Sequence, residues 1–217
     1  MLYITHKERM FLTFVIIYSL IPTFGGLLRS IELIGVPAII PENPRAGAAP
    51  IPIILHILSS FIFCIMGVFQ FLPSVRHHRI SWHRMIGTLV AGSGLLSALT
   101  GLWMTITFAF PEALQGTVLF WVRVIVSLSM VGLIVWAVIS IRQGQLPSHR
   151  AAMIRCFALG QGASTQTFLG IGWMVFGGSE PTGLARDLLM TSAWILNVLI
   201  AELLIAKHES GHRQTIF

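Results

Sequence analysis

The sequence predicts an all-α integral membrane protein with six transmembrane helices in one bundle. Two features of its composition predict this class: 55% of the residues are apolar and only 10% are charged, and the mean hydropathy is +0.82. Soluble domains carry about 25% charged residues, so this chain has too little charge to cover a surface facing water. The third observation is that its apolar runs recur at the length of membrane spans.

A helix needs about 20 apolar residues to cross the hydrocarbon core of a bilayer. The first span, 10–28, follows the charged HKER stretch and ends at Arg29. The second, 51–73, follows a proline-rich loop and ends at Pro73. The third, 85–110, follows the basic stretch VRHHRISWHR and ends before Pro111.

The last three spans have similar boundaries of glycine or charge. The fourth, 118–141, follows Gly116 and ends before Arg142, and the fifth, 151–176, ends before Gly177. The sixth, 188–206, begins after Asp187 and ends at Lys207. We therefore expect a single six-helix transmembrane domain over 1–217, with an irregular or re-entrant outer loop at 29–50 and a cytoplasmic tail at 207–217.

The distribution of Lys and Arg predicts the orientation. One set of loops and both tails contain Lys7, Arg9, Arg76, Arg79, Arg84, Arg142, Arg150, Lys207 and Arg213. The opposite loops contain Arg29, Arg45 and Arg186. Because cytoplasmic loops are enriched in Lys and Arg, both termini are expected in the cytoplasm. The same rule explains the net charge of +6 without a nucleic-acid partner.

Two His-Arg pairs mark a weak internal repeat. His83–Arg84 lies in VRHHRISWHR and His149–Arg150 in QLPSHRAAMIR, each directly before an expected helix. Both helices then carry small residues at alternating steps of four and three: Gly87, Ala91, Gly94, Ala98 and Gly101 in one, and Cys156, Gly160, Ala163, Thr167 and Gly170 in the other. Helices two-three and four-five thus read as a duplicated hairpin. Small faces allow close approach of another helix or of a flat cofactor.

Several polar groups are predicted at membrane depth, where charge is costly and faces the bundle interior. This polar seam consists of His56, Gln70, Arg123, Arg155, Gln161, Gln166, Asn197 and Glu202. Arg155 and Glu202 have matching depths on adjacent antiparallel helices, which predicts a salt bridge. The seam suggests either a pathway or a cofactor pocket.

The stretches LHILSSFIFCIMGVFQFLP, RISWHRMIG, SHRAAMIRCFAL and WILNVLIAELL resemble a bacterial family of multi-pass membrane proteins, domain of unknown function 2306. The matching positions are His56, Gly67, Gln70, Phe71, His83, Arg84, Gly87, His149, Arg150, Met153, Arg155, Asn197 and Glu202. The family often has another basic residue further along helix five, where this chain reads STQTFLG. The resemblance implies a multi-pass protein of the bacterial inner membrane.

A looser similarity is to membrane b-type cytochromes, which hold heme between histidines of neighbouring helices, with glycines making room for the porphyrin. It implies heme b at the cytoplasmic side between helices three and five, with His83 and His149 as axial ligands. A quinone is the other candidate cofactor of this electron-transfer reading. The expected cofactor-binding residues are His83, His149, Arg84, Arg150, Gly87, Gly94 and Gly160.

Two other function classes stay open at this point. The His-Arg corners, placed at helix N-termini, also suit an anion or a lipid headgroup. The small faces equally suit a partner helix, in a non-catalytic accessory subunit of a respiratory or photosynthetic complex or in a homo-oligomer. A transporter is less favoured, because the repeat is parallel and no broken helix is expected. Whether the protein is an enzyme is left open, and no catalytic residue is assigned.

Overall fold

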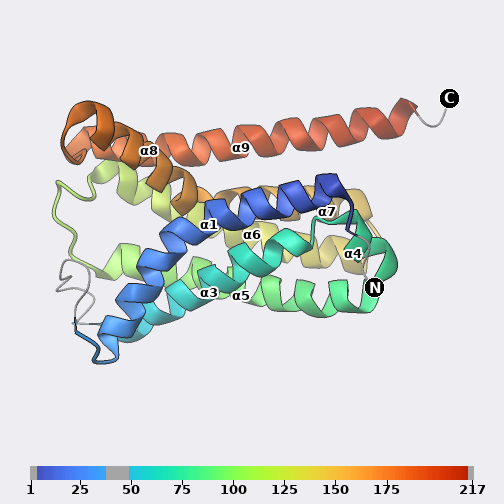
Figure 1. Cartoon of the computed structure of the whole chain (residues 1–217), viewed down its shortest axis with the longest axis horizontal. Helices are drawn as coiled ribbons and strands as arrows, with labels where there is room; N and C mark the ends of the chain where they lie inside the picture. Colours follow the sequence, from blue (N-terminus) through green and yellow to red (C-terminus); the bar gives the residue numbers. More distant parts are fainter. Residues whose placement is uncertain (1–3, 38–48, 215–217) are drawn as a thin grey trace. The chain divides into compact units, whose positions relative to one another are not determined.

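The chain is described here from a computed structural model, which defines the backbone of residues 4–37 and 49–214 and the side chains up to residue 208. All regular secondary structure in these ranges is helical (Figure 1). The helices are α1 (His6–Leu33), α3 (Pro50–Phe69), α4 (Pro73–His78), α5 (Ile80–Thr107), α6 (Thr117–Arg142), α7 (Leu146–Gly160), α8 (Gly162–Gly177) and α9 (Gly183–Gln214).

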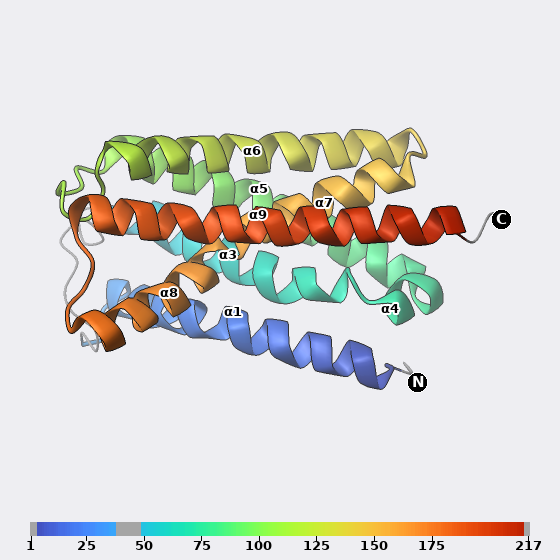
Figure 2. The same cartoon turned by 90° about the horizontal axis from the view of Figure 1, so that it is seen from above.

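Five of these helices are long and apolar enough to cross a membrane: α1, α3, α5, α6 and α9, the last counted to His208. They correspond to five of the six spans expected from the sequence. The fifth expected span, 151–176, is not one continuous helix. It is divided between α7 and α8 at Gln161, and Figure 2 shows α8 leaving the direction of α7. The count of six spans therefore stays a prediction.

Several helices extend beyond the expected spans into regions that were assigned to loops or to the tail. Residues 29–33 of the expected outer loop belong to α1, and most of the expected tail, up to Gln214, continues α9. The remainder of the proposed outer cap, residues 38–48, lies outside the described residues, as do residues 215–217.

The chain divides into two compact units, residues 1–108 and 109–217, and each is described by itself. In the N-terminal unit α3 packs against both α1 and α5. Its most buried large side chains are Phe63, Val68, Leu72 and Val90. Apolar packing between these helices thus forms the core of the unit.

Glu8 joins the start of α1 to the short helix α4. Its carboxylate accepts hydrogen bonds from the backbone N–H of Thr5 at 2.9 Å and from that of Ser74 at 2.8 Å. Thr5 in turn accepts from the Glu8 N–H, which completes a capping box. One buried carboxylate therefore satisfies backbone donors at the N-termini of two helices.

In the C-terminal unit α6 packs against α7 and α9, and α9 also packs against α7 and α8. Small side chains make these contacts close: Ala137, Cys156 and Ala193 are completely buried. Cys156 of α7 donates its thiol hydrogen to the Met130 carbonyl of α6 at 3.9 Å. The α7 part of the small-residue face is thus filled by a neighbouring helix.

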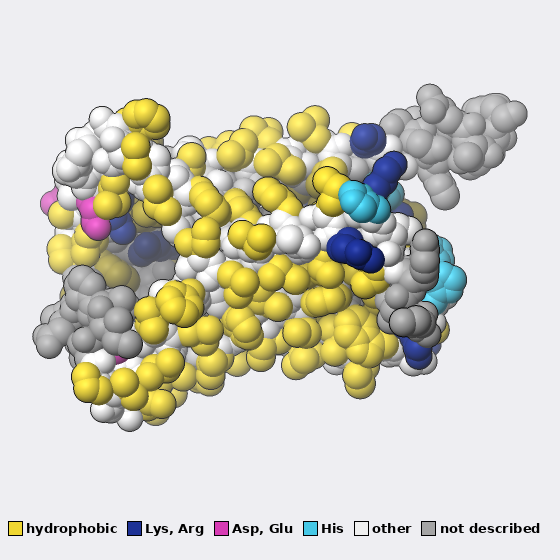
Figure 3. Space-filling view, viewed as in Figure 1, with side chains coloured by type: hydrophobic (Ala, Val, Ile, Leu, Met, Phe, Trp, Pro, Cys, Tyr) yellow, Lys and Arg dark blue, Asp and Glu magenta, His cyan; other side chains and the backbone are white. Residues whose placement is uncertain are grey.

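The outward faces of the helices are strongly apolar. Figure 3 shows mainly hydrophobic side chains along the flanks of the helices, and even large ones such as Phe176, Phe14 and Leu203 are well exposed. A soluble protein rarely exposes apolar surface of this extent. This surface is the one expected of helices that face lipid.

Candidate cofactor-binding site

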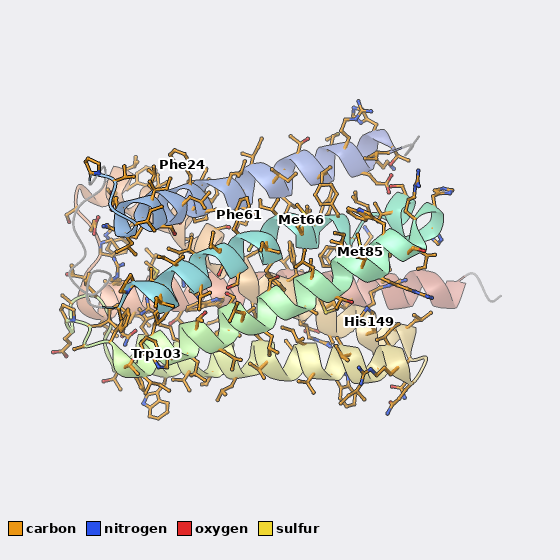
Figure 4. The ribbon with its side chains drawn as sticks, turned by 90° about the horizontal axis from the view of Figure 1, so that it is seen from below. Phe24, Phe61, Met66, Met85, Trp103 and His149 are labelled. Carbon is orange, nitrogen blue, oxygen red and sulfur yellow. The ribbon has the colours of Figure 1, made fainter. Side chains whose placement is uncertain are left out.

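His149 is held in one ring orientation by the preceding helix. It lies in the first turn of α7, and its Nδ1 is 2.9 Å from the carbonyl oxygen of Ala137 in α6 (Figure 4). A carbonyl only accepts hydrogen bonds, so Nδ1 carries the proton and donates it. In the neutral ring the lone pair is then on Nε2. Metal-ligating histidines are commonly oriented in this way, with the second nitrogen bonded to a carbonyl.

The other two predicted cofactor-binding residues of α7 differ in exposure. The Arg150 side chain is exposed, whereas Gly160, at the end of α7, is half-buried. The buried side chains of Ala137 and Ala152 keep α6 and α7 close together near the imidazole. The cytoplasmic end expected for α7 thus presents one oriented imidazole and one exposed guanidinium.

His83 and Arg84 begin α5 in the N-terminal unit. His83 is half-buried in the first turn and Arg84 is exposed. One turn further on, a Cβ placed on Gly87 would be 3.1 Å from Oε1 of Gln70. Gly94, deeper in the helix, is buried. The small residues of α5 therefore serve packing against α3, at least in part.

Two polar residues, one in α3 and one at its C-cap, lie against α5. His56 places its Nδ1 2.9 Å from the Ser97 carbonyl oxygen and 3.2 Å from the Thr100 hydroxyl. Gln70, fourteen residues later, lies beside Gly87. The two residues thus lie along the same neighbouring helix, as the spacing on α3 predicts.

The interruption between α7 and α8 is stabilised by two side chains of α9. The indole N–H of Trp194 donates to the Leu159 carbonyl at 3.2 Å, and the amide of Asn197 donates to the Ala158 carbonyl at 3.0 Å. These carbonyls lie in the last turn of α7, where helical partners are missing. Irregular backbone at membrane depth is tolerated where other protein groups satisfy it.

A glycine makes this arrangement sterically feasible. A Cβ on Gly162 would lie 2.0 Å from Nε1 of Trp194, a distance that no real side chain allows. Only glycine therefore lets the indole reach the carbonyl of Leu159. The triplet Gly160–Gln161–Gly162 is the sequence signal of the break, and the expectation of a continuous helix overlooked it.

Hydroxyl and amide side chains extend the network around the break. Thr165 donates to Asn197 Oδ1 at 2.7 Å, and Ser164 donates to Gln161 Oε1 at 3.0 Å. All four residues are buried. Gln166 adds a bond to the Met190 carbonyl at 3.1 Å. Ser164, Thr165 and Trp194 belong to the network but were not among the predicted site residues.

The predicted salt bridge between α7 and α9 is confirmed. Arg155 contacts Glu202 through two parallel hydrogen bonds of 2.6 and 2.8 Å. This bidentate geometry is the strongest form of an arginine–carboxylate contact. The two side chains are 38% and 45% exposed. Arg123, another member of the predicted seam, lies in the second turn of α6.

The described residues contain no cluster of side chains typical of a metal centre. No three His, Cys, Asp or Glu side chains there lie close enough to bind a metal ion. The pentapeptide at 208–212, HESGH, matches the H-E-x-x-H pattern of zinc enzymes and lies in the last turns of α9. Side chains beyond residue 208 are outside the described set, and a two-histidine pattern alone does not assign a zinc site.

The comparisons with known proteins agree with the helical fold and its apolar surface. The family model described as "Predicted membrane protein (DUF2306)" matches residues 53–205, from α3 to α9. No curated protein and no solved structure matches the chain significantly. Since the family model covers well over half of the sequence, the chain belongs to the DUF2306 family of predicted membrane proteins.

Proposed function

We propose that this protein binds a redox cofactor within the membrane and takes part in electron transfer, with heme b or a quinone held by His149. The observation that supports this most is the hydrogen bond from His149 Nδ1 to the Ala137 carbonyl. It leaves Nε2 of the neutral ring as the atom that offers a lone pair.

The surroundings of His149 fit such a group. The carbonyl of Ala137 lies in a packed helix, so it fixes the plane of the imidazole and the direction of Nε2. The exposed Arg150 adds a positive charge that favours an anionic substituent, such as a heme propionate or a reduced quinone. When bound, the cofactor would supply the electron acceptance and release that protein side chains lack.

The proposal includes a location and an orientation. We place the protein in the inner membrane of a bacterium with both termini cytoplasmic, which puts His149 at the cytoplasmic side. The nine Lys and Arg residues of one set of loops, against three in the other, support this orientation. Five candidate spans and the family description support the membrane, and the sixth crossing is assigned to α7 and α8 together.

An absorption spectrum of the purified protein tests the heme version. A Soret band that shifts on reduction with dithionite supports it, and His149→Ala should remove at least most of the bound heme. His78→Ala is the matched control, because His78 is an exposed histidine of α4. His83→Ala shows whether the second histidine suggested by the sequence is also a ligand.

Solvent extraction followed by mass spectrometry tests the quinone version on the same preparations. A quinone present in stoichiometric amount in wild type and lost from His149→Ala supports it. The proposal is rejected if wild-type protein carries neither heme nor quinone after purification from membranes in mild detergent. It is also rejected if His149→Ala retains the full cofactor content.

A further inference from the structure

The helices α6 and α9 begin side by side because a carboxylate of α9 caps α6. Asp187, in the first turns of α9, is only 2% exposed. Its Oδ1 accepts the Gly116 N–H at 3.0 Å and its Oδ2 accepts the Leu119 N–H at 3.1 Å. A Cβ on Gly116 would be 2.6 Å from Oδ2, so glycine is required for this close approach.

Two arginines lie at this same end of the C-terminal unit. Arg123 of α6 donates a hydrogen bond to the side-chain oxygen of Gln115, and its guanidinium carbon lies 5.3 Å from the centre of the Phe110 ring. Arg186 precedes Asp187 in α9, and its Nε is buried with no hydrogen-bond partner among the described residues. The two arginines repel each other electrostatically, while Asp187 attracts Arg123.

Among the buried and half-buried charged side chains at this end there are two arginines and one carboxylate, while Glu112 and Glu180 in the flanking loops are exposed. Both oxygens of Asp187 already accept backbone N–H groups. The side-chain ion pairs Arg29–Glu32 and Arg155–Glu202 of the described residues involve neither Arg123 nor Arg186. The N-termini of α6 and α9 add partial positive charge. Asp187 thus balances only one of the two arginines, and unbalanced buried charge is unfavourable near a membrane.

We propose that Arg123 and Arg186 together bind an oxyanion, namely a phosphate group. Guanidinium groups contact phosphate through paired N–H donors, and Arg186 has such a donor in place and unused. The contact with Gln115 and the ring of Phe110 orient Arg123 for the same ligand. The phosphate comes either from solution or from an anionic phospholipid headgroup at the membrane surface.

This site is distinct from the proposed cofactor site. Arg123 precedes Ala137, the partner of His149, by fourteen residues of the same helix. This separation corresponds to about 21 Å along α6. The two proposals can therefore be tested independently in one protein.

Thermal unfolding of the delipidated full chain in detergent tests the site. Sodium phosphate is compared with sodium chloride at equal pH and ionic strength, so that general screening is the same. We expect phosphate to raise the Tm of wild type and to raise that of Arg186→Gln and Arg123→Gln much less. Arg142→Gln, an exposed arginine at the other end of α6, is the matched control and should respond like wild type.

The stability of Arg186→Gln relative to wild type in the absence of phosphate provides a second readout. In chloride, Arg186→Gln should be at least as stable as wild type, because it removes the repulsion of Arg123. In phosphate the order should reverse. The proposal is overturned if phosphate shifts all variants equally, or if Arg186→Gln is the less stable protein by the same amount in both salts.

Native mass spectrometry of protein reconstituted with phosphatidylglycerol or with phosphatidylcholine distinguishes the two sources. Retention of phosphatidylglycerol by wild type and Arg142→Gln, but not by Arg186→Gln, assigns a lipid headgroup. A response to inorganic phosphate without specific lipid retention assigns free phosphate. Absence of both overturns the proposal.

Discussion

Helix α5 and the helix pair α7–α8 carry the same spacing of small residues but have different backbones. Both contain a His-Arg pair near their start, and both place glycine, alanine or another small residue at steps of four and three. Yet α5 is continuous over 28 residues, whereas the other segment is interrupted at Gln161. Small residues therefore determine where helices approach closely, but they do not determine whether a helix continues.

The difference lies in what the neighbouring helix donates. In the N-terminal unit α3 contributes His56 to the Ser97 carbonyl, and α5 remains regular around that residue. In the C-terminal unit α9 contributes Trp194 and Asn197 to carbonyls at the end of α7. A break becomes favourable when such donors replace the lost helical bonds and a glycine makes room for them.

The largest expected effect comes from adding a methyl group at the break. Gly162→Ala places a Cβ where the Trp194 indole lies, so the Trp194–Leu159 bond should be lost and the packing disturbed. Overpacking of this kind costs about 3 kcal/mol. Unfolding of the purified protein in detergent measures the loss. Gly172→Ala, also in α8, is the control, because its Cβ would meet nothing within 4 Å. Equal stability of the two variants would contradict the steric account.

An intermediate loss of stability is expected when the side-chain amide of Asn197 is removed. Asn197→Leu leaves the Ala158 carbonyl and the Thr165 hydroxyl without their partner, which should cost about 2 kcal/mol. Thr167→Val is the matched control, since Thr167 bonds only to a carbonyl of its own helix. A double-mutant cycle with Thr165→Val isolates the α8–α9 contact. A coupling energy near zero would mean that this bond does not hold the two helices together.

The salt bridge should contribute less than the network at the break. Both of its side chains are well exposed, so Glu202→Gln is expected to cost about 1 kcal/mol. The cost of Glu202→Gln should disappear in an Arg155→Gln background, because the salt bridge is already lost there. The same unfolding assay measures this cycle, and an unchanged cost in that background would argue against a direct pair.

The smallest effect is expected at the corresponding glycine of the continuous helix. A Cβ on Gly87 would be 3.1 Å from the flexible end of Gln70, which can move aside. Gly87→Ala should therefore change stability by under about 1 kcal/mol, because the helix propensity of alanine offsets the contact. Gly92→Ala, whose Cβ is unobstructed, should be stabilising. If Gly87→Ala were as harmful as Gly162→Ala, the contrast between the two helices would not hold.

The sequence predicts much of the helical framework because hydropathy and charge act locally. Five of the expected spans correspond to helices, and the Arg155–Glu202 pair follows from matching depths on antiparallel helices. The break at Gln161 was not predicted, because its stability depends on side chains of α9 more than thirty residues away. Similarly, Asp187 reads as an ordinary loop acid, and only the fold shows that it caps α6.

The candidate site is less accessible from sequence than the framework. The position of His149 at a helix start was predicted, but its bond to Ala137 depends on how α6 and α7 pack. The proposed pairing of His83 with His149 joins residues of two separately described units and stays a prediction. Arg84 and Arg150 are both exposed, so short motifs identified the charged residues without showing what they contact.

The Glu8 carboxylate has a practical consequence for anyone who produces this protein. Through Thr5 and Ser74 it connects the first turn of α1 to a residue 66 positions later in the chain. A reporter or affinity tag fused immediately upstream should therefore be joined through a spacer that leaves Thr5 and Glu8 unperturbed. A rigid fusion at that point would strain α4 as well as α1, although α4 is far from the fusion junction in sequence.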